Sequence, residues 1–380
     1  MTNDNIQKGD YVICLAVLIQ PVLVLLQHVL IDVFGMESEA TTTYRVVLTA
    51  IPMIAAISVG FYRSSVRFLF VYAITILILL LTICFFPLNE QYIRREGVRF
   101  LLPLIIPSAL CLVTVNSMDV LKRSLNIMAW SGALLVLFYI ISFFAGVFII
   151  DSYNMSFSYG CLLPMVVLYS QRTIPSTIMS FVMFIAVLAI GSRGGAIIFV
   201  GYVLIDALLN KRKGRWLILL LGLIFVASIP ALMSFFDSIG ISSRTMTLLN
   251  SGNITYDSGR DNIYQTCIEA LLDHPFFGVG LFGDRAILGG VYCHNFVLEI
   301  CLDFGLFWGV FIILTLILLF IRSFLISKGD GRSLLLVLTC ACFLPYMVSG
   351  SYLVANNIAI WLGYVLLILN GIEVRDQDAT

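Results

Sequence analysis

The chain has 380 residues, of which 60% are hydrophobic and only 12% are charged, and its mean hydropathy is +1.03. A soluble domain carries about 25% charged residues, so this composition excludes a soluble globular protein. The formal net charge is zero at pH 7, which argues against a nucleic-acid partner, because such proteins present a strongly basic surface. The chain instead contains many long apolar runs, each able to cross a bilayer as a helix.

We expect an all-α fold, a polytopic transmembrane helix bundle of about 12 spans, because each run is continuously apolar and a membrane β-barrel would alternate. The longest polar segment, residues 236–293, is expected to be one large, partly helical loop. It separates an N-terminal transmembrane bundle, 1–235, from the C-terminal transmembrane helices and short tail of 294–380. The expected spans lie near 11–33, 44–62, 67–86, 98–115, 126–150, 158–170, 174–190, 194–210, 215–235, 296–322, 333–350 and 353–370.

The basic residues predict the orientation of these spans, because cytoplasmic loops are enriched in Lys and Arg. The run Lys211-Arg212-Lys213-Gly214-Arg215 precedes the span at 215–235 and is expected to be cytoplasmic. Alternating the spans then places both termini in the cytoplasm and leaves no lysine outside. Residues 236–293 and the short connection at 191–193 fall on the same outer face.

The first candidate functional residue is Arg193, in the connection Gly191-Ser192-Arg193-Gly194-Gly195. The glycines allow a ligand to approach the backbone closely, and amides at the start of a helix favour an anion. We therefore predict that Arg193 binds an anion, with Gly194 and Gly195 contributing backbone contacts. The alternative is an arginine that anchors a helix end at the membrane interface.

The second candidate is Arg260, which precedes a predicted amphipathic helix over residues 261–273. Arg260 would lie in its first turn, available either to a substrate or to a surface ion pair with Asp257 or Asp261. Arg244 and Arg285 are further basic residues of the same loop and are predicted to contact substrate. One face of the predicted helix carries Ile263, Cys267, Ala270 and Leu271.

The stretch from His274 to Gly283 follows this helix and contains the spacing Gly-x-Gly-x-x-Gly. A dinucleotide site would require a preceding strand in a βαβ unit, which the hydropathy pattern does not offer. We therefore expect a tight turn that returns the loop to the membrane. His274 is expected at the C-terminus of the helix and not in catalysis.

His294 and Asn295 begin the next apolar run, on the same predicted face as Arg193 and Arg260. Histidine can give or take a proton near neutral pH, although a polar residue at a helix start is also common at interfaces. Glu299 follows within the same helix. An intramembrane carboxylate usually has a partner, and an arginine from the preceding loop would serve.

Each of two other groups of residues allows two interpretations. Arg94, Arg95 and Arg99 are expected to form a solvated outer cluster, or else to support an anionic substrate. Cys267 and Cys293 are expected to be free thiols, or a disulfide where the loop is oxidised.

Five motifs in this order resemble the bacterial O-antigen ligase and polymerase superfamily. They cover roughly residues 190–310, and the segment Tyr153–Pro164 with the modest chain length favours a polymerase. The motifs are Ser192–Gly195, Gly259-Arg260, His274–Gly280, His294–Glu299 and Phe304–Gly309.

The resemblance implies a glycosyltransferase of the bacterial inner membrane with its active site in the periplasm and no cofactor or metal. The implied substrate is an undecaprenyl-pyrophosphate-linked oligosaccharide, with membrane lipids and a chain-length regulator protein as further partners. Arg193 and Arg260 would hold the pyrophosphate, since guanidinium groups suit phosphate, and His294 would complete the catalytic site. Asn295, Asp261 and Glu299 are expected beside the substrate, and His294, Asp261 and Glu299 remain alternatives for the base.

Three functions are compatible with these residues. A polymerase would join lipid-linked repeat units, whereas a ligase would transfer the finished glycan to lipid A–core. A lipid-linked glycan transporter is the third, from a different class. It would require charged residues along a path through the membrane, and the sequence offers few, Asp206 and Asp32 among them.

Overall fold

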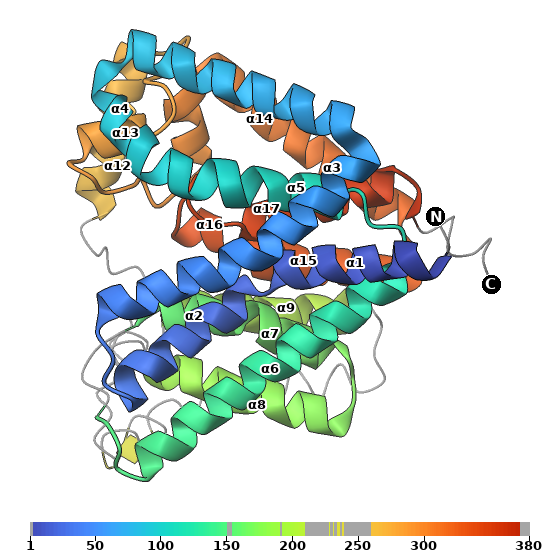
Figure 1. Ribbon diagram of the computed structural model, residues 1–380. Coiled ribbons are helices and arrows are strands. Elements are labelled where there is room, and N and C mark those ends of the chain that lie inside the picture. Colours follow the sequence, from blue (N-terminus) through green and yellow to red (C-terminus); the bar gives the residue numbers. More distant parts are fainter. Residues whose placement is uncertain are drawn as a thin grey trace. The chain divides into compact units, whose positions relative to one another are not determined.

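The computed structural model describes residues 3–149, 154–190, 192–209 and 260–372, together with a few positions between 228 and 238 (Figure 1). These residues are mostly helical and include no strand, which confirms the all-α class. They form two compact units, the first comprising Met1–Leu18, Ala50–Ser124 and Asp257–Thr380, and the second Ile19–Thr49 and Leu125–Tyr256. The units interleave along the chain, and the expected divisions at residues 235 and 293 stay a prediction.

Within the described residues, four segments are long and apolar enough to cross a membrane, and a fifth is the bent pair Asn5–Leu18 and Gln20–Val33, with an angle of 44°. The multi-pass character is therefore confirmed, while the count of about 12 spans stays a prediction. The four segments are α3 (Ser38–Phe85), α6 (Met118–Phe144), α14 (Phe296–Ile326) and Gly329–Val348, and shorter apolar helices are α7 (Met155–Ser170), α8 (Ile174–Ile190), α9 (Arg193–Leu209) and α17 (Asn357–Leu369).

The remaining helices are shorter; some of them make up the bent pair and the segment Gly329–Val348, and the others connect the segments. In the second unit they are α2 (Gln20–His28) and the π-helical turn η1 (Val29–Val33). In the first unit they are α1 (Asn3–Leu18), η2 (Pro87–Asn89), α4 (Glu90–Tyr92), η3 (Ile93–Ile105), α5 (Ile106–Leu112), α12 (Arg260–Asp273), α13 (Gly283–Ile287), α15 (Gly329–Leu338), η4 (Thr339–Phe343) and α16 (Pro345–Val348).

Helix α3 contains the break that the sequence predicts between two spans. Ser64 has φ −154° and ψ 54°, which are not helical values, and it lies within the expected connection between spans 44–62 and 67–86. The residues on both sides are helical, so the two predicted spans are two arms of one kinked element.

The core of the first unit forms where α17 packs against α5 and α14, and α1 packs against α5. Gly363 of α17 allows this approach, since a Cβ there would lie 3.0 Å from Leu112 Cβ and 3.1 Å from the Ala109 carbonyl oxygen. Asn356, just before α17, donates to the Val17 carbonyl oxygen at 3.0 Å. The second unit has its own core, in which α7 packs against α2, α8 and α9.

A second break lies in α14, at Gly305, whose φ of 84° and ψ of 163° interrupt the helix. Such a break removes helical partners from nearby backbone groups, and the loop 274–283 replaces them. Val279 N–H donates to the Leu302 oxygen at 2.8 Å, and Gly280 N–H to the Asp303 oxygen at 3.2 Å. In return, Leu306 N–H donates to the Pro275 oxygen at 2.7 Å.

Glycines of the motifs His274–Gly280 and Phe304–Gly309 allow this close contact between the loop 274–283 and the α14 break. A Cβ on Gly278 would overlap the Leu302 oxygen, and a Cβ on Gly305 would overlap the Phe276 backbone. Gly278 and Gly280 have φ of 65° and 77°, which glycine adopts at little cost. The predicted tight turn is therefore confirmed, and the Gly-x-Gly-x-x-Gly spacing serves backbone packing against α14.

We expect Gly305→Ala to destabilise the protein, because a side chain there has both an unfavourable φ and a steric overlap. Backbone strain of this kind costs on the order of 1–3 kcal/mol, and the overlap adds to it. Thermal unfolding of the purified protein in detergent measures the change. Gly201→Ala is the matched control, since a Cβ at Gly201 meets nothing within 4 Å. Equal melting temperatures for the two variants would contradict the close packing of the loop 274–283 against the α14 break.

Candidate functional site

The loop between α16 and α17 collects the basic residues at one end of the first unit. Arg260 Nη1 donates to the Val348 carbonyl oxygen at 2.6 Å. The neighbouring Ser349 Oγ lies 3.2 Å from His294 Nδ1, and Ser351 Oγ accepts a hydrogen bond of 2.5 Å from Arg285 Nη2. Arg260 and His294, which are distant in sequence, thus contact consecutive residues, the last residue of α16 and the first residue of the loop that follows it.

Arg260 is held at the first position of α12, as the sequence predicts. Cys267 and Leu271 are the buried residues of this helix, and Ile263 and Ala270 pack against the same cluster. The predicted buried face of the helix is therefore confirmed, and it leaves Arg260 half-buried and Asp261 exposed. His274 follows the end of α12, with its N–H bonded to the Ala270 oxygen at 3.1 Å, as expected for a helix C-terminus.

His294 adopts an unusual backbone conformation. Its φ is 60°, in the left-handed region that residues other than glycine seldom occupy. The Tyr292 ring lies against the imidazole, with centroids 4.2 Å apart. Asn295 then begins α14 as its N-cap, because its side chain accepts a 3.0 Å hydrogen bond from Leu298 N–H. This turn fixes the direction of the imidazole relative to the helix.

The environment of His294 keeps its imidazole neutral. Burial is the largest cause and the positive charge of Arg260 adds to it, so that the pKa of His294 is lowered from 6.5 to about 4 despite the opposing effect of Asp284. The ring therefore carries no charge at neutral pH. It has one nitrogen lone pair that can accept a proton.

Arg285 is fully buried and lies at the centre of an ion cluster. Its Nη1 lies 2.7 Å from Asp284 Oδ1 and 2.8 Å from Glu299 Oε1, and its Nε lies 3.3 Å from Glu96 Oε2. Ser351 Oγ also donates to Glu299 Oε1. The expectation that a loop arginine pairs with Glu299 is confirmed, and Arg285 is that arginine.

The cluster fixes the charge of Arg285 and the shape of the loop that precedes α14. Burial alone would lower the pKa of the Arg285 guanidinium. The opposing effect of Asp284 and Glu299 is larger, so the net pKa is raised. Asp284 Oδ2 also accepts the Cys293 N–H at 2.9 Å, next to His294. All three guanidinium nitrogens of Arg285 have protein acceptors, which suits positioning rather than contact with a substrate.

A groove of about 770 Å³ lies beside this cluster, between α3, the loop 274–281 and α14. Its lining is mainly aromatic and aliphatic, and Phe276, Phe277 and Trp308 are exposed along it. Asp303 lines the groove although it is only 2% exposed. Its Oδ2 accepts the Tyr352 hydroxyl at 2.5 Å, while its Oδ1 has no hydrogen-bond partner among the described residues.

Arg193 belongs to the second unit, where it begins α9; its side chain lies outside the described atoms. Gly194 and Gly195 are buried. A Cβ on Gly195 would overlap Ser158 Oγ of α7, so this glycine allows α7 and α9 to pack closely. The convergence of Arg193 with Arg260 and His294 stays a prediction. Arg244 lies outside the described residues.

The second unit also holds a polar cluster that hydropathy alone conceals. His28, buried in α2, lies 3.0 Å from Asn154 Nδ2 through Nδ1 and 2.9 Å from Ser156 Oγ through Nε2. Asn154 N–H donates to the Ile190 oxygen at 2.9 Å, close to the start of α9. A histidine inside the first apolar run was the available signal for this cluster.

The outer cluster at Arg94, Arg95 and Arg99 is exposed. Arg94 pairs with Glu90, and Arg99 lies 5.3 Å from the Phe100 ring centroid. These contacts agree with the solvated interpretation. Cys267 and Cys293 are free and buried, in one apolar cluster. Sequence reasoning missed Ser349 and Ser351, whose signal was a polar Ser-Gly-Ser triplet between two apolar runs.

We expect Arg285→Gln to reduce the stability of the folded protein, because it leaves Asp284 and Glu299 without a cation. Removing one partner of a buried ion pair costs about 3–5 kcal/mol. Thermal unfolding in detergent, compared with the exposed control Arg99→Gln, checks this. A melting temperature of Arg285→Gln equal to that of the control would show that the cluster is not stabilising.

Residues 178–314 match the family model described as O-antigen ligase. No curated protein matches the chain. The matched stretch contains Arg193, Arg260 and His294, and also the loop 274–283 with the α14 break that it stabilises. Over these residues, the match confirms that the chain resembles the O-antigen ligase and polymerase superfamily.

Proposed function

We propose that the protein is a glycosyltransferase of the bacterial inner membrane that acts on undecaprenyl-pyrophosphate-linked glycans at the periplasmic face. The proposed reaction is polymerisation of lipid-linked repeat units, as in O-antigen synthesis. The observation that carries the proposal is the pairing of Arg260 and His294 on Val348 and Ser349. A phosphate-binding cation and a proton acceptor are thereby presented together.

Arg260 supplies the charge that a departing pyrophosphate needs. Its guanidinium offers five donors in a planar fork, and the bond to Val348 orients that fork. As the bond between the anomeric carbon and the pyrophosphate oxygen breaks, negative charge grows on the leaving group. A cation already in place stabilises that charge without reorganisation, so the proposed transfer uses guanidinium groups and no metal ion.

His294 is the proposed base. The acceptor hydroxyl oxygen forms the new bond to the anomeric carbon, and its proton passes to the imidazole. The depressed pKa of His294 ensures that the ring is unprotonated at neutral pH, although it also makes the ring a weaker base. Asp261 is exposed, and Glu299 is committed to Arg285 and Ser351, so neither competes well for this role.

The roles of the other predicted residues follow from their positions. Arg193 stays a predicted ligand of the pyrophosphate, with Gly194 and Gly195 allowing a close approach. Asn295 and Arg285 position His294 and the loop 349–356, and neither is assigned to substrate. The apolar groove beside Asp303 is assigned to the polyprenyl chain, because its exposed aromatic lining suits an isoprenoid and adjoins the Arg285 cluster.

The ligase activity uses the same donor and differs in its acceptor. Deletion of the gene separates the two: a strain without its polymerase still caps its lipopolysaccharide with one repeat unit, whereas a strain without its ligase has no cap. For a transporter, the mid-span carboxylates would line a path. Asp206 is instead 3.5 Å from Arg172, and Asp32 accepts a 2.8 Å hydrogen bond from Tyr139.

We expect Arg260→Ala and Arg260→Lys each to abolish polymer at normal protein levels, since lysine cannot reproduce the planar fork. Arg99→Ala, which removes an exposed outer arginine, should leave polymer unchanged. Electrophoresis of surface polysaccharide from cells expressing each variant, with immunoblots for protein level, gives the result. Wild-type polymer from Arg260→Lys would restrict Arg260 to a structural role.

The pH dependence of transfer provides a separate test of His294. A base with a pKa of about 4 stays neutral from pH 8 down to pH 5, so proton uptake by His294 should cause no loss of rate over that range. An unperturbed histidine would lose activity below about pH 6.5. The measurement is the initial rate of chain elongation in proteoliposomes; a decline centred near pH 6.5 would contradict the neutral, buried imidazole.

A further inference from the structure

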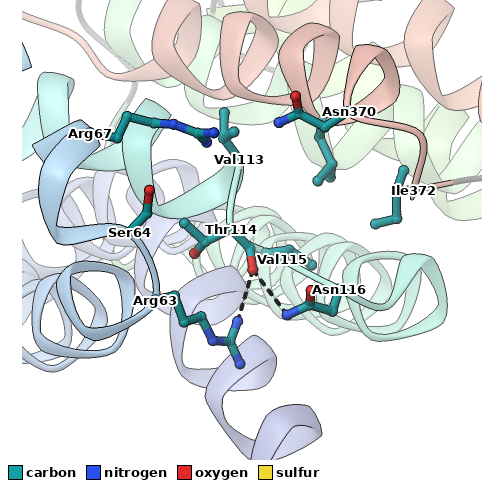
Figure 2. Close-up of a pocket in the computed structure, with 10 residues that line it drawn as sticks. Arg63, Ser64, Arg67, Val113, Thr114, Val115, Asn116, Asn370 and Ile372 are labelled. Atoms are coloured by element: carbon teal, nitrogen blue, oxygen red, sulfur yellow. Dashed lines mark hydrogen bonds between the residues drawn. The ribbon is translucent and has the colours of Figure 1, made fainter. Parts of the chain in front are cut away.

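A polar cavity lies at the other end of the first unit. It has a volume of about 430 Å³ and opens where α3 breaks at Ser64 (Figure 2). Its lining comes from that break, from the segment 113–116 between α5 and α6, and from the end of α17. The lining residues are Arg63, Ser64, Arg67, Val113, Thr114, Val115, Asn116, Leu367, Asn370 and Ile372.

Arg63 is a fixed part of the cavity wall. Its Nη1 lies 2.5 Å from Asp10 Oδ1 and donates to the Thr114 oxygen at 3.0 Å, and its Nη2 donates to the Ile6 oxygen at 2.8 Å. Asp10 also accepts the backbone N–H groups of Asn116 and Ser117, each at 3.0 Å. The charge of Arg63 is therefore balanced by Asp10, and the geometry of the wall is set.

Arg67 differs from Arg63 in this respect. It is exposed, and it has no hydrogen-bond or ion-pair partner within the part of the chain that the structure describes. Figure 2 shows the Arg67 and Asn370 side chains pointing towards one another across the cavity. The Arg67 guanidinium and the Asn370 side-chain amide together offer several N–H donors to one small anion.

The position of the cavity indicates which anions it can meet. The loop 349–356, whose first residue contacts His294, precedes α17, and Asn370 follows this helix. Helix α17 has 13 residues, which corresponds to about 20 Å of helix. The cavity therefore lies at the opposite end of α17 from the proposed active site. Basic pockets between transmembrane helices are recurrent sites for anionic headgroups.

We propose that this cavity binds a phosphate group, with Arg67 as the principal cation and Asn370 as an amide donor. The phosphate can belong to the headgroup of an anionic phospholipid or to a free phosphate ion. The interaction with Arg67 is bidentate where geometry allows, as guanidinium–phosphate pairs commonly are. The site is independent of the proposed transfer reaction and would stabilise the fold around the α3 break.

The test compares full-length protein in neutral detergent with added phosphatidylglycerol, phosphatidylcholine or inorganic phosphate, followed by thermal unfolding. Phosphatidylglycerol should raise the melting temperature in a dose-dependent way, and phosphatidylcholine should not. Arg67→Gln should weaken the apparent affinity at least about tenfold, since one charge-assisted bidentate contact is lost. Arg322→Gln is the matched control, because Arg322 is exposed and outside the cavity.

The outcomes separate the sources of phosphate. A shift with inorganic phosphate alone that Arg67→Gln abolishes supports the site with a free ion as its ligand. A shift with phosphatidylglycerol alone that the same substitution abolishes supports a lipid. Equal responses of Arg67→Gln and Arg322→Gln, or equal stabilisation by phosphatidylcholine and phosphatidylglycerol, would overturn the proposal.

Discussion

The buried guanidinium of Arg285 is the interaction on which one end of the first unit depends. An unpaired charge in an apolar interior is strongly unfavourable, so Arg285 can be buried only where acceptors surround it. Those acceptors come from η3, α13, α14 and the loop before α17, through Glu96, Asp284, Glu299 and Ser351. Three stretches far apart in sequence, namely η3, the α13–α14 region and the loop before α17, are therefore held at one point, and apolar packing alone would not fix their register.

The Arg285 ion cluster is linked to the region of Arg260 and His294 by short stretches of chain. Ser351, which bonds Arg285, lies two residues from Ser349, which contacts His294. Asp284 accepts the N–H of Cys293, the residue before His294. The break of α14 at Gly305 fixes the preceding part of the chain, because the loop 274–283 donates hydrogen bonds to the carbonyl groups exposed at the break. Both ends of the segment that carries His294 are thus fixed by polar bonds to α14.

Local patterns in the sequence predicted local features well. The spacing of Cys267 and Leu271 gave the buried face of α12, and the polar residues near Ser64 marked the break in α3. The proximity of Glu299 to a loop arginine followed from the cost of a lone intramembrane carboxylate. Which arginine would pair with it did not follow, because hydropathy carries no information on distant contacts.

Arg285 illustrates the limit most clearly. The sequence alone does not distinguish Arg285 from Arg260, since both are arginines in one polar segment, and both were expected to contact the substrate. Their difference lies in burial: Arg285 is fully buried against carboxylates, whereas Arg260 is half-buried at a helix start. The serines of the loop 349–356 were missed for a similar reason, because a short polar triplet between spans usually indicates only a turn.

His294 has a left-handed backbone conformation, which bears on the role of its side chain. A non-glycine residue at φ 60° is strained by on the order of 1 kcal/mol or more. The N-cap bond from Asn295 returns about 1 kcal/mol, so the segment tolerates the strain without gaining from it. A glycine would adopt this turn more easily, but it would lack the imidazole. Histidine stands at a position where glycine is the easier residue, and this favours a chemical use of the side chain over a purely structural one.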